Sequence, residues 1–578
     1  MILQALVDYY EVQADAGKLP RPGWSTVSVS WALSISAQGE LLDVIPLQQE
    51  VEQGKKTVLR PRQMVVPEQF KRSSGVCANF LCDNAAYLLG IDSKGRPERT
   101  RECYEAAVAL HRKVLAGVEG MTAMAILAFF ERWDTEMATE HPLLIERLED
   151  IKKGGNLLFR VEGHFAHEDP EIRKRWQSFG GSNAETASIC LVTGCSDVPA
   201  RLHPSIKGIR GGQATGTSLV SFNAEAYCSY GKEQGQNAPV GEYAAFAYTT
   251  VLNALVRNRK NTMLLGDTTV VLWSQSGSAA AEELMHDSFD MSSDTMSESD
   301  LMAAMEQLAK GRPVRLAEEE IDPDMPFYIL GLAPNAGRLA VRFFLRNTLG
   351  AFSTRLLEHQ QRLEIVRPAY DKREHLSFYW LLQETVNMNS RDKNPSSVLT
   401  GELLRAVLTG DRYPATLLNG VNLRIRAERE ISRGRAAIIK AYYLRNPHPD
   451  CPKEALTVEV NDSKCIPYCL GQAFSILEAI QEAASPDLNA TIKDKYFDSA
   501  AATPSIIFPI LIRLTNKHLR KLEKGRKIYY EKQLGDLLGN ISGYPTRMTL
   551  PQQGVFQLGY YHQTQKRYEK KKEDNGNV

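Results

Sequence analysis

The segment STVSVSWALSISAQGELLDVIP, residues 25–46, decides the fold class near the start of the chain. Apolar side chains alternate from Val27 to Ile35, Gln38-Gly39-Glu40 marks a turn, and apolar residues resume at Leu41. A two-residue period is that of a β-strand that buries one face. We therefore predict a β-hairpin here, and with it a sheet that starts early in the chain.

Helical and β-type periods surround this hairpin. Residues 1–16 form an amphipathic opening helix, and helical periodicity returns over 103–152 and 239–259. Strand candidates lie at 156–161, 187–193, 218–222, 262–273, 327–333 and 339–345. Beyond residue 350 the helical windows are 350–366, 374–389, 397–410, 413–446, 465–484, 504–524, 527–539 and 551–571. The fold class predicted is α+β: a mixed α/β N-terminal body with an antiparallel sheet, then a mostly helical C-terminal half ending in a helical bundle.

The helical half is interrupted by prolines at Asn446-Pro447-His448-Pro449, where a helix cannot continue. We therefore predict a mixed body over 1–349, a helical region over 350–460 and a C-terminal bundle over 461–578. Residues 279–325 carry thirteen Asp or Glu against three Lys or Arg. We interpret this stretch as an acidic surface insertion between strands, with one short helix; a solvated loop without a specific role would have the same composition.

Composition favours a folded protein, because apolar residues make up 43% and charged residues 24% of the 578 residues. Nine cysteines without a CxxC pair indicate reduced thiols. The first residues show no basic and apolar leader, and no later stretch is apolar enough for a membrane span. We expect a cytoplasmic protein without membrane insertion.

The formal net charge is zero, with 69 basic and 69 acidic residues, which excludes a uniformly basic nucleic-acid coat. The basic residues are nevertheless concentrated: ten against four acids in 53–101, eight against two in 412–445, and fourteen against six in 511–578. Neutralising a phosphate backbone releases counterions, so rows of cations suit a polyanion. A solubilising helix face remains the alternative for any one row.

Two rows have helical spacing. Arg426, Arg429, Arg433 and Lys440 are three, four and seven residues apart, which predicts one shared face. The second row opposes an apolar side that includes Leu511, Leu519 and Leu522, and its cations are Arg513, Lys517, Arg520, Lys521 and Lys524.

The strongest loop motif is LHPSIKGIRGGQATGTSLVSFN, residues 202–223. Its glycines, Gly208 among them, allow close backbone approach, while Lys207 and Arg210 supply charge. A phosphate-binding loop of nucleotide hydrolases would need lysine where Thr217 stands, so that function is rejected. A loop that touches a nucleic-acid backbone or groove and an ordinary tight connection both remain open.

Two further segments combine amides with cations. In YCSYGKEQGQNAPVGEYAAF, residues 227–246, amide side chains and a lysine lie near Gly231 and Gly235, where they can reach base edges, although a mere turn would look the same. The segment KRSSGVCANFLCDNAAYLLG, residues 71–90, is similar. Candidate groove or strand-separating residues in the three segments are Lys71, Arg72, Asn79, Lys207, Gly208, Arg210, Gln213, Lys232, Gln234 and Asn237.

Catalytic patterns are weak. His164 and His167 in EGHFAHED fit a polar turn better than a cation site, and the cysteine spacings do not match a zinc knuckle. Asp267 in LLGDTTVVLW is a single carboxylate, and one carboxylate does not make a two-metal nuclease. We predict no cofactor, no metal and no catalytic residue. The alternative is a metal-dependent nuclease acting on DNA or RNA through Asp267 with His164 or His167.

Long segments along the chain are similar to one known family. They are NFLCDNAAYLLGID (79–92), the loop motif of 202–223, SYGKEQGQNAPV (229–240), LLGDTTVVLW (264–273), FYILGLAPNAGRLAVRFF (327–344), YCLGQAFSILEAIQEAASPDLNATIKDKYFDSAAATP (468–504) and LGYYHQTQKRYEKKK (558–572). With these segments the chain resembles the large subunit of the type I-C CRISPR surveillance complex, Cascade.

The resemblance implies a non-catalytic subunit that reads the protospacer-adjacent motif in duplex DNA, helps to unwind the target and stabilises the R-loop. Guide pairing would read the remaining sequence, a division of labour also found in another CRISPR effector class. The partners implied are the guide RNA, target DNA with its displaced strand, the backbone, guide-processing and small subunits of Cascade, and a separate helicase-nuclease recruited for degradation.

The resemblance also implies that the C-terminal bundle is similar to the small Cascade subunit, of which a separate copy is made by internal translation. No Met lies between Met388 and Met548, so such a start would use a codon read here as Val or Leu, such as Val458 or Val460.

Overall fold

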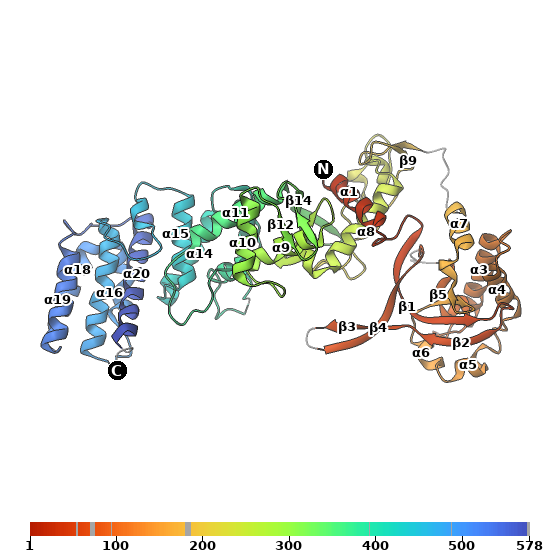
Figure 1. The fold of residues 1–578 in the computed structure, drawn as a ribbon, viewed down its shortest axis with the longest axis horizontal. Coiled ribbons are helices and arrows are strands. Elements are labelled where there is room, and N and C mark those ends of the chain that lie inside the picture. Colours follow the sequence, from red (N-terminus) through yellow and green to blue (C-terminus); the bar gives the residue numbers. More distant parts are fainter. Residues whose placement is uncertain are drawn as a thin grey trace. The chain divides into compact units, whose positions relative to one another are not determined.

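The computed structural model describes residues 1–53, 56–69, 75–93, 95–179, 187–222, 224–391, 393–486 and 488–574. The chain divides into two compact units. Unit 1 comprises Met1–Pro204 and Val220–Leu252, and unit 2 comprises Ser205–Leu219 and Asn253–Val578. Strands are concentrated before residue 350 and helices after it, which confirms the predicted α+β class (Figure 1). The divisions between the units, at 204/205, 219/220 and 252/253, differ from the predicted boundaries near 349 and 460.

The main sheet of unit 1 is built on β1 (Trp24–Ile35). Both β2 (Leu41–Pro46) and β4 (Lys56–Pro67) pair with β1 antiparallel, and β6 (Asn156–Val161) pairs with it parallel. The short strands β3 (Gln48–Gln53), β5 (Cys82–Asn84) and β7 (His164–Phe165) complete the sheet. The predicted hairpin is confirmed, with Leu33 opposite Val44.

Gly39 closes that hairpin with a φ of 81°, in the left-handed region that favours glycine. A Cβ at this position would lie 2.4 Å from the backbone nitrogen of Phe129 in α4 (Met121–Arg132). The turn therefore packs directly on a helix backbone, and only glycine fits there.

Helices cover this sheet and supply aromatic side chains to its core. They are α2 (Ala85–Leu88), α3 (Pro97–Leu115), α4, α5 (Pro142–Ile145), α6 (Leu148–Lys152) and α7 (Pro170–Phe179). Leu33, Phe129, Phe159 and Trp176 lie in one buried cluster. The remainder of unit 1 includes α1 (Ile2–Asp15) and the start of α8 (Glu242–Arg257), within which the division between the units falls. The strand predicted at 187–193 is reduced to β8 (Ser188–Ile189), paired with β9 (Ser196–Asp197).

Unit 2 contains a four-stranded antiparallel sheet in the order β10 (Thr262–Leu265), β11 (Thr268–Ser274), β14 (Pro326–Asn335) and β15 (Arg338–Thr348). The predicted strands at 262–273, 327–333 and 339–345 are confirmed. The strand predicted at 218–222 is wrong, because Ser218 makes only an isolated bridge with Arg338.

The acidic stretch is part of the core of unit 2. It forms α9 (Ala279–Asp290), α10 (Glu298–Ala309), β12 (Val314–Leu316) and β13 (Glu319–Ile321). Leu301, Met305 and Leu308 are at most 1% exposed and belong to the large apolar cluster. Their spacing is helical, but the thirteen acids of the stretch conceal this period in the composition. The stretch is inserted between the neighbouring strands β11 and β14, as predicted, but the predicted surface position and single short helix are wrong.

The helical half of unit 2 shares one apolar cluster with this sheet, from Leu265 to Tyr561. Its helices are α11 (Leu349–Leu363), α12 (Phe378–Gln383), α13 (Ser397–Thr409), α14 (Ala415–Glu428), α15 (Arg433–Arg445), α16 (Ile466–Ala484), α17 (Ile492–Ala502), α18 (Pro504–Leu519), α19 (Lys524–Leu538) and α20 (Leu550–Asp574) (Figure 1). The sequence patterns did not indicate α17. No helix in the described part of the chain combines the length and the apolar character needed to span a membrane.

Candidate nucleic-acid interface

The glycine-rich segment forms a closed loop, residues 205–219, on unit 2. The backbone N–H of Ile206 donates to the oxygen of Thr217 at 2.7 Å, and the N–H of Thr217 donates to that of Ile206 at 2.8 Å. Gly216 has a φ of 103°, and a Cβ there would lie 2.8 Å from the Ser205 side chain. The loop ends are thus pinned together, and glycine is required where they meet.

The rest of unit 2 anchors this loop. The N–H of Lys207 donates to Asn253 Oδ1 at 2.8 Å, and the N–H of Ser218 donates to the oxygen of Gly337 at 3.0 Å. Ile206 and Ile209 point inward and are 1% and 6% exposed. The loop conformation is therefore fixed before any ligand arrives.

Three long polar side chains of the loop face solvent, whereas Thr217 is buried. Lys207, Arg210 and Gln213 are exposed. Gly208 and Gly211 directly follow the two cations and have φ values of 84° and 77°, in the left-handed region that favours glycine. Within the described ranges, neither Lys207 nor Arg210 takes part in an ion pair. Two cations and one amide are thus available to a ligand on a rigid support.

The second candidate segment forms a tight tip in unit 1. Residues Gln234–Asn237 make one 3-10 turn, closed by a capping box between Glu233 and Gln236. The amide oxygen of Asn237 accepts from the Ser229 N–H at 2.9 Å, while its nitrogen donates to the oxygens of Lys232 and Gln234 at 3.1 and 3.0 Å. Arg201 Nε donates to Gln234 Oε1 at 2.7 Å. Asn237 and Gln234 therefore brace the tip, and Lys232 is its exposed cation.

Sequence reasoning missed Tyr230 at this tip. Its side chain is 99% exposed, and its φ is 54°. The signal that could have identified it is the Tyr-Gly pair inside a glycine-bounded polar segment, where an aromatic residue has no local structural use.

Asn79 does not reach the surface. It is 5% exposed, and its backbone N–H donates to Asp83 Oδ2 at 2.8 Å. The neighbouring Leu81 has a φ of 59° and donates its N–H to Nε2 of the buried His111 at 2.9 Å. The segment folds inward because its apolar residues enter the core of unit 1, so Asn79 is not placed to touch a groove. Lys71 and Arg72 lie outside the described residues.

The predicted shared face of Arg426, Arg429, Arg433 and Lys440 does not form. Helix α14 ends at Glu428, Arg429 caps it with a φ of 55°, and α15 begins at Arg433. The Ser432 side chain caps α15 by accepting from the Arg435 N–H. The break between two separately capped helices removes the helical phase on which the prediction depended.

Two members of that row are buried. Arg433 is 7% exposed and donates to Asp371 Oδ2 at 3.2 Å and to the backbone oxygens of Arg373 and Glu374. Burial opposes ionisation of Asp371, yet hydrogen bonds from Arg373 and Arg433 lower its pKa to about 2. Lys440 is 2% exposed, and burial lowers its pKa to about 8. Only Arg426 and Arg429 remain exposed, and Arg426 Nη2 donates to Gln553 Oε1 at 3.3 Å.

The second cationic row is exposed throughout. It spans the end of α18, the following turn and the first residue of α19, and comprises Arg513, Lys517, Arg520, Lys521 and Lys524. On the opposite side, Leu511 and Leu519 are 1% and 5% exposed. None of the five cations forms an ion pair with another described residue. This surface, which we name the α18–α19 row, can bind a polyanion without first breaking internal salt bridges.

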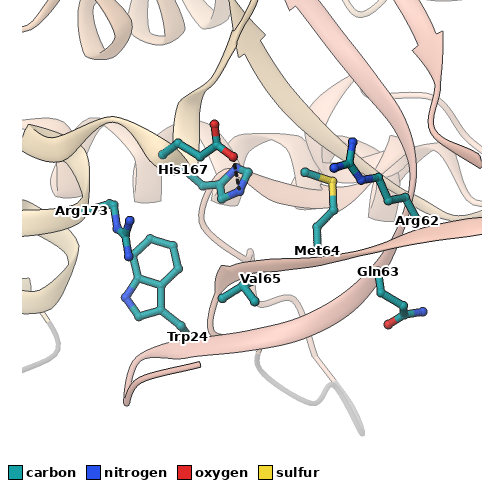
Figure 2. Close-up of a pocket in the computed structure, with 8 residues that line it drawn as sticks. Trp24, Arg62, Gln63, Met64, Val65, His167 and Arg173 are labelled. Carbon is teal, nitrogen blue, oxygen red and sulfur yellow. Dashed lines mark ion pairs between the residues drawn. The ribbon is translucent and has the colours of Figure 1, made fainter. Parts of the chain in front are cut away.

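The residues of the alternative nuclease hypothesis fall in different units. His164 and His167 belong to unit 1, and Asp267 belongs to unit 2, where its carboxylate lies 3.5 Å from Arg342 Nη2. His167 lines a pocket of about 310 Å³ with Trp24, Met64 and Arg173, whose guanidinium lies 5.1 Å from the centre of the Trp24 ring (Figure 2).

His167 in that pocket is an uncharged, buried side chain. Burial and the nearby Arg173 lower the pKa of His167 to about 4, so the imidazole is neutral at pH 7. Its 4.0 Å approach to Glu168 is therefore not an ion pair at that pH.

A different group brings metal-type donors together in unit 2. Of the described residues, Glu298, Glu374 and His375 have donor atoms within 4.8 Å of one another. The same oxygen of Glu298 accepts from the backbone N–H of His375 at 2.9 Å and lies 2.6 Å from its Nδ1. This oxygen is already used as a hydrogen-bond acceptor.

Comparison with known proteins gives one family. The family model described as CRISPR-associated protein (Cas_Csd1) matches residues 6–568. No curated protein matches the chain. The match includes both the glycine-rich loop and the α18–α19 row.

Proposed function

The chain belongs to the Cas_Csd1 family of CRISPR-associated proteins, large subunits of the type I-C Cascade complex, and from this premise we propose that it recognises the protospacer-adjacent motif in double-stranded DNA. In this proposal the subunit acts without catalysis. It helps to unwind the target, stabilises the R-loop and recruits the separate helicase-nuclease. Guide RNA and the other Cascade subunits are its partners.

The observation that supports motif reading best is the anchored loop of residues 205–219. Lys207 and Arg210 suit phosphate contacts, which position a protein on the duplex, and Gln213 suits hydrogen bonds to base edges, which carry sequence information. The donor and acceptor pattern of the minor groove is degenerate. A reader of that groove would accept several related motifs.

The α18–α19 row supports a role in holding a strand. Its cations are exposed and unpaired by described carboxylates, so each phosphate that it neutralises would release counterions. Binding through such a surface is independent of sequence. We assign the displaced strand to it.

Motif reading is tested with the full chain assembled with guide RNA and the other subunits, on target duplexes with an intact or a scrambled flanking motif. We expect Gln213→Ala to reduce the preference for the intact motif about tenfold, since one lost base contact costs about 1–3 kcal/mol. The double variant Lys207→Ala/Arg210→Ala should weaken both duplexes alike and reduce the salt slope by about 2. The matched control is Arg312→Ala/Arg315→Ala, two exposed cations with the same spacing in the same unit. Unchanged preference with Gln213→Ala would contradict the assignment.

Strand holding is tested by charge reversal in the α18–α19 row. Lys517→Glu/Lys521→Glu should shorten the R-loop lifetime to a similar extent for all target sequences, because the row contacts phosphates alone in this proposal. The lifetime is measured at several salt concentrations. A loss confined to particular sequences would show that the row reads bases instead.

A further inference from the structure

The tip of unit 1 places Tyr230 where local backbone preferences oppose it. The N–H of Lys232 donates to the oxygen of Ser229 at 3.0 Å, and the two residues between them, Tyr230 and Gly231, have φ values of 54° and 70°. Two positive φ values in a two-residue turn are those of a type I′ turn, which favours Asn, Asp or Gly at both positions. A tyrosine in the left-handed region costs about 1–2 kcal/mol.

Packing does not compensate for this cost. The Tyr230 side chain is 99% exposed, whereas Tyr10, Tyr248 and Tyr468 are fully buried in the same protein. Tyr230 thus combines an unfavourable backbone conformation with a fully exposed aromatic ring, and each of these departs from ordinary local preferences. Such departures are expected at functional positions.

The support beneath the ring is rigid. Asn237 binds the backbone of the turn at Ser229 and Lys232, as described above. A Cβ on Gly235 would lie 2.0 Å from the oxygen of Ala200, so the base of the tip packs backbone against backbone. A ligand that covers the ring therefore pays little for ordering the turn.

We propose that Tyr230 stacks on a nucleobase at a junction between paired and unpaired strands. The exposed Lys232, two residues away, supplies a cation for the adjoining phosphate. Stacking on an aromatic side chain stabilises a bound base by about 1–3 kcal/mol and needs no particular sequence. The inference rests on the proposed nucleic-acid function and adds to it the residue that holds an opened base.

The test uses the complete complex assembled with guide RNA, with 2-aminopurine placed singly either in the target DNA beside the motif or in the guide. Stacking on the ring changes the fluorescence of the base. The change should appear with the labelled DNA if the stacked base belongs to the DNA, and with the labelled guide if it belongs to the guide. In whichever of the two experiments shows the change, we expect Tyr230→Ala to abolish it. For a DNA base, that variant should also weaken target binding about 5- to 100-fold, while Tyr230→Phe keeps both. The matched control is Tyr370→Ala, since Tyr370 is 86% exposed in unit 2.

The outcomes separate the inference from the function on which it rests. If Tyr230→Ala behaves as wild type in both arms, or Tyr230→Phe fails as Tyr230→Ala does, base stacking by the ring is excluded. If Tyr230→Ala impairs subunit assembly before nucleic acid is added, the ring contacts protein and the inference is overturned. If the wild-type complex fails to bind target DNA, the proposed function fails. The fluorescence of the labelled guide then tests by itself whether Tyr230 stacks on a base. Unchanged melting temperatures of the variants verify folding.

Discussion

At the scale of single residues, His111 shows how one buried side chain fixes a candidate segment. Its Nδ1 donates to the oxygen of Ala107 at 2.7 Å, and its Nε2 accepts the N–H of Leu81. Both ring nitrogens are engaged in one neutral tautomer. Burial lowers the pKa of His111 to about 4, which keeps it neutral at pH 7.

Replacing His111 should separate its packing from its hydrogen bonding. The ring contacts Phe80 and Phe130 at centroid distances of 5.1 and 4.8 Å. We expect His111→Ala to lower the free energy of unfolding by about 3–5 kcal/mol, and His111→Phe by about 1–3 kcal/mol, because Phe fills the space but leaves the Leu81 N–H unsatisfied. Urea unfolding measures both, with the exposed His164→Phe as control. Wild-type stability of His111→Phe would show that the bond to Leu81 contributes nothing.

At the scale of secondary-structure elements, α16 and α20 cross at glycines. A Cβ on Gly471 would lie 2.0 Å from the backbone oxygen of Phe556, and one on Gly559 would lie 2.2 Å from that of Tyr468. These neighbours are backbone atoms, which cannot rotate away. The spacing of the two helices is therefore set by the absence of side chains.

Alanine at this crossing should force the helices apart. We expect Gly559→Ala to lower the free energy of unfolding by about 3 kcal/mol, the upper part of the range for overpacking. The control is Gly535→Ala in α19, where a Cβ meets nothing within 4 Å. That change should stabilise the helix by up to about 1 kcal/mol. Equal effects of the two changes in thermal and urea unfolding would refute the close-packing argument.

Elements with a strong local hydrophobic period could be predicted from the sequence. Element ends and burial that depend on capping or tertiary contacts could not. The hairpin at 25–46 was predicted because its alternation is unbroken. The break at 429–432 was missed because it depends on Arg429 in a left-handed conformation and on the Ser432 cap, which the periodicity of the stretch does not reveal. The same limit applies to the candidate site: Lys207 and Arg210, chosen from the sequence for their charge in a glycine-rich segment, are exposed, but the burial of Asn79 follows from Leu81 and His111, thirty residues apart.

At the scale of the whole molecule, the histidines with the most strongly lowered pKa values, five in number, make stability dependent on pH. Burial lowers the pKa of His111, His167, His203 and His562 to about 4, and that of His359 to about 3. In the unfolded chain these groups bind protons below their usual pKa of about 6.5. The folded state does not, so the unfolded state gains stability as the pH falls.

We therefore expect full stability from the histidines above pH 6.5 and a progressive loss between pH 6.5 and about 4, which continues to about pH 3 for His359. Each pH unit costs at most about 1.4 kcal/mol for each histidine. Because unit 1 holds His111, His167 and His203 while unit 2 holds His359 and His562, both units should be destabilised. Urea midpoints across this range measure the effect, and His562→Phe should reduce the slope. Stability that is constant from pH 7 to 4 would contradict the assigned neutrality.

The closed loop of residues 205–219 also has a consequence during synthesis. Its partners Gly337, in the turn between β14 and β15, and Leu339, on β15, leave the ribosome about 120 residues later, or roughly 10 s at ordinary elongation rates. Until then the loop lacks its backbone hydrogen bonds to Gly337 and Leu339, and only the pair between Ile206 and Thr217 and the contact with Asn253 can hold it. If the proposed reading of duplex DNA needs the fully anchored loop, recognition through it becomes possible only after translation has passed β15.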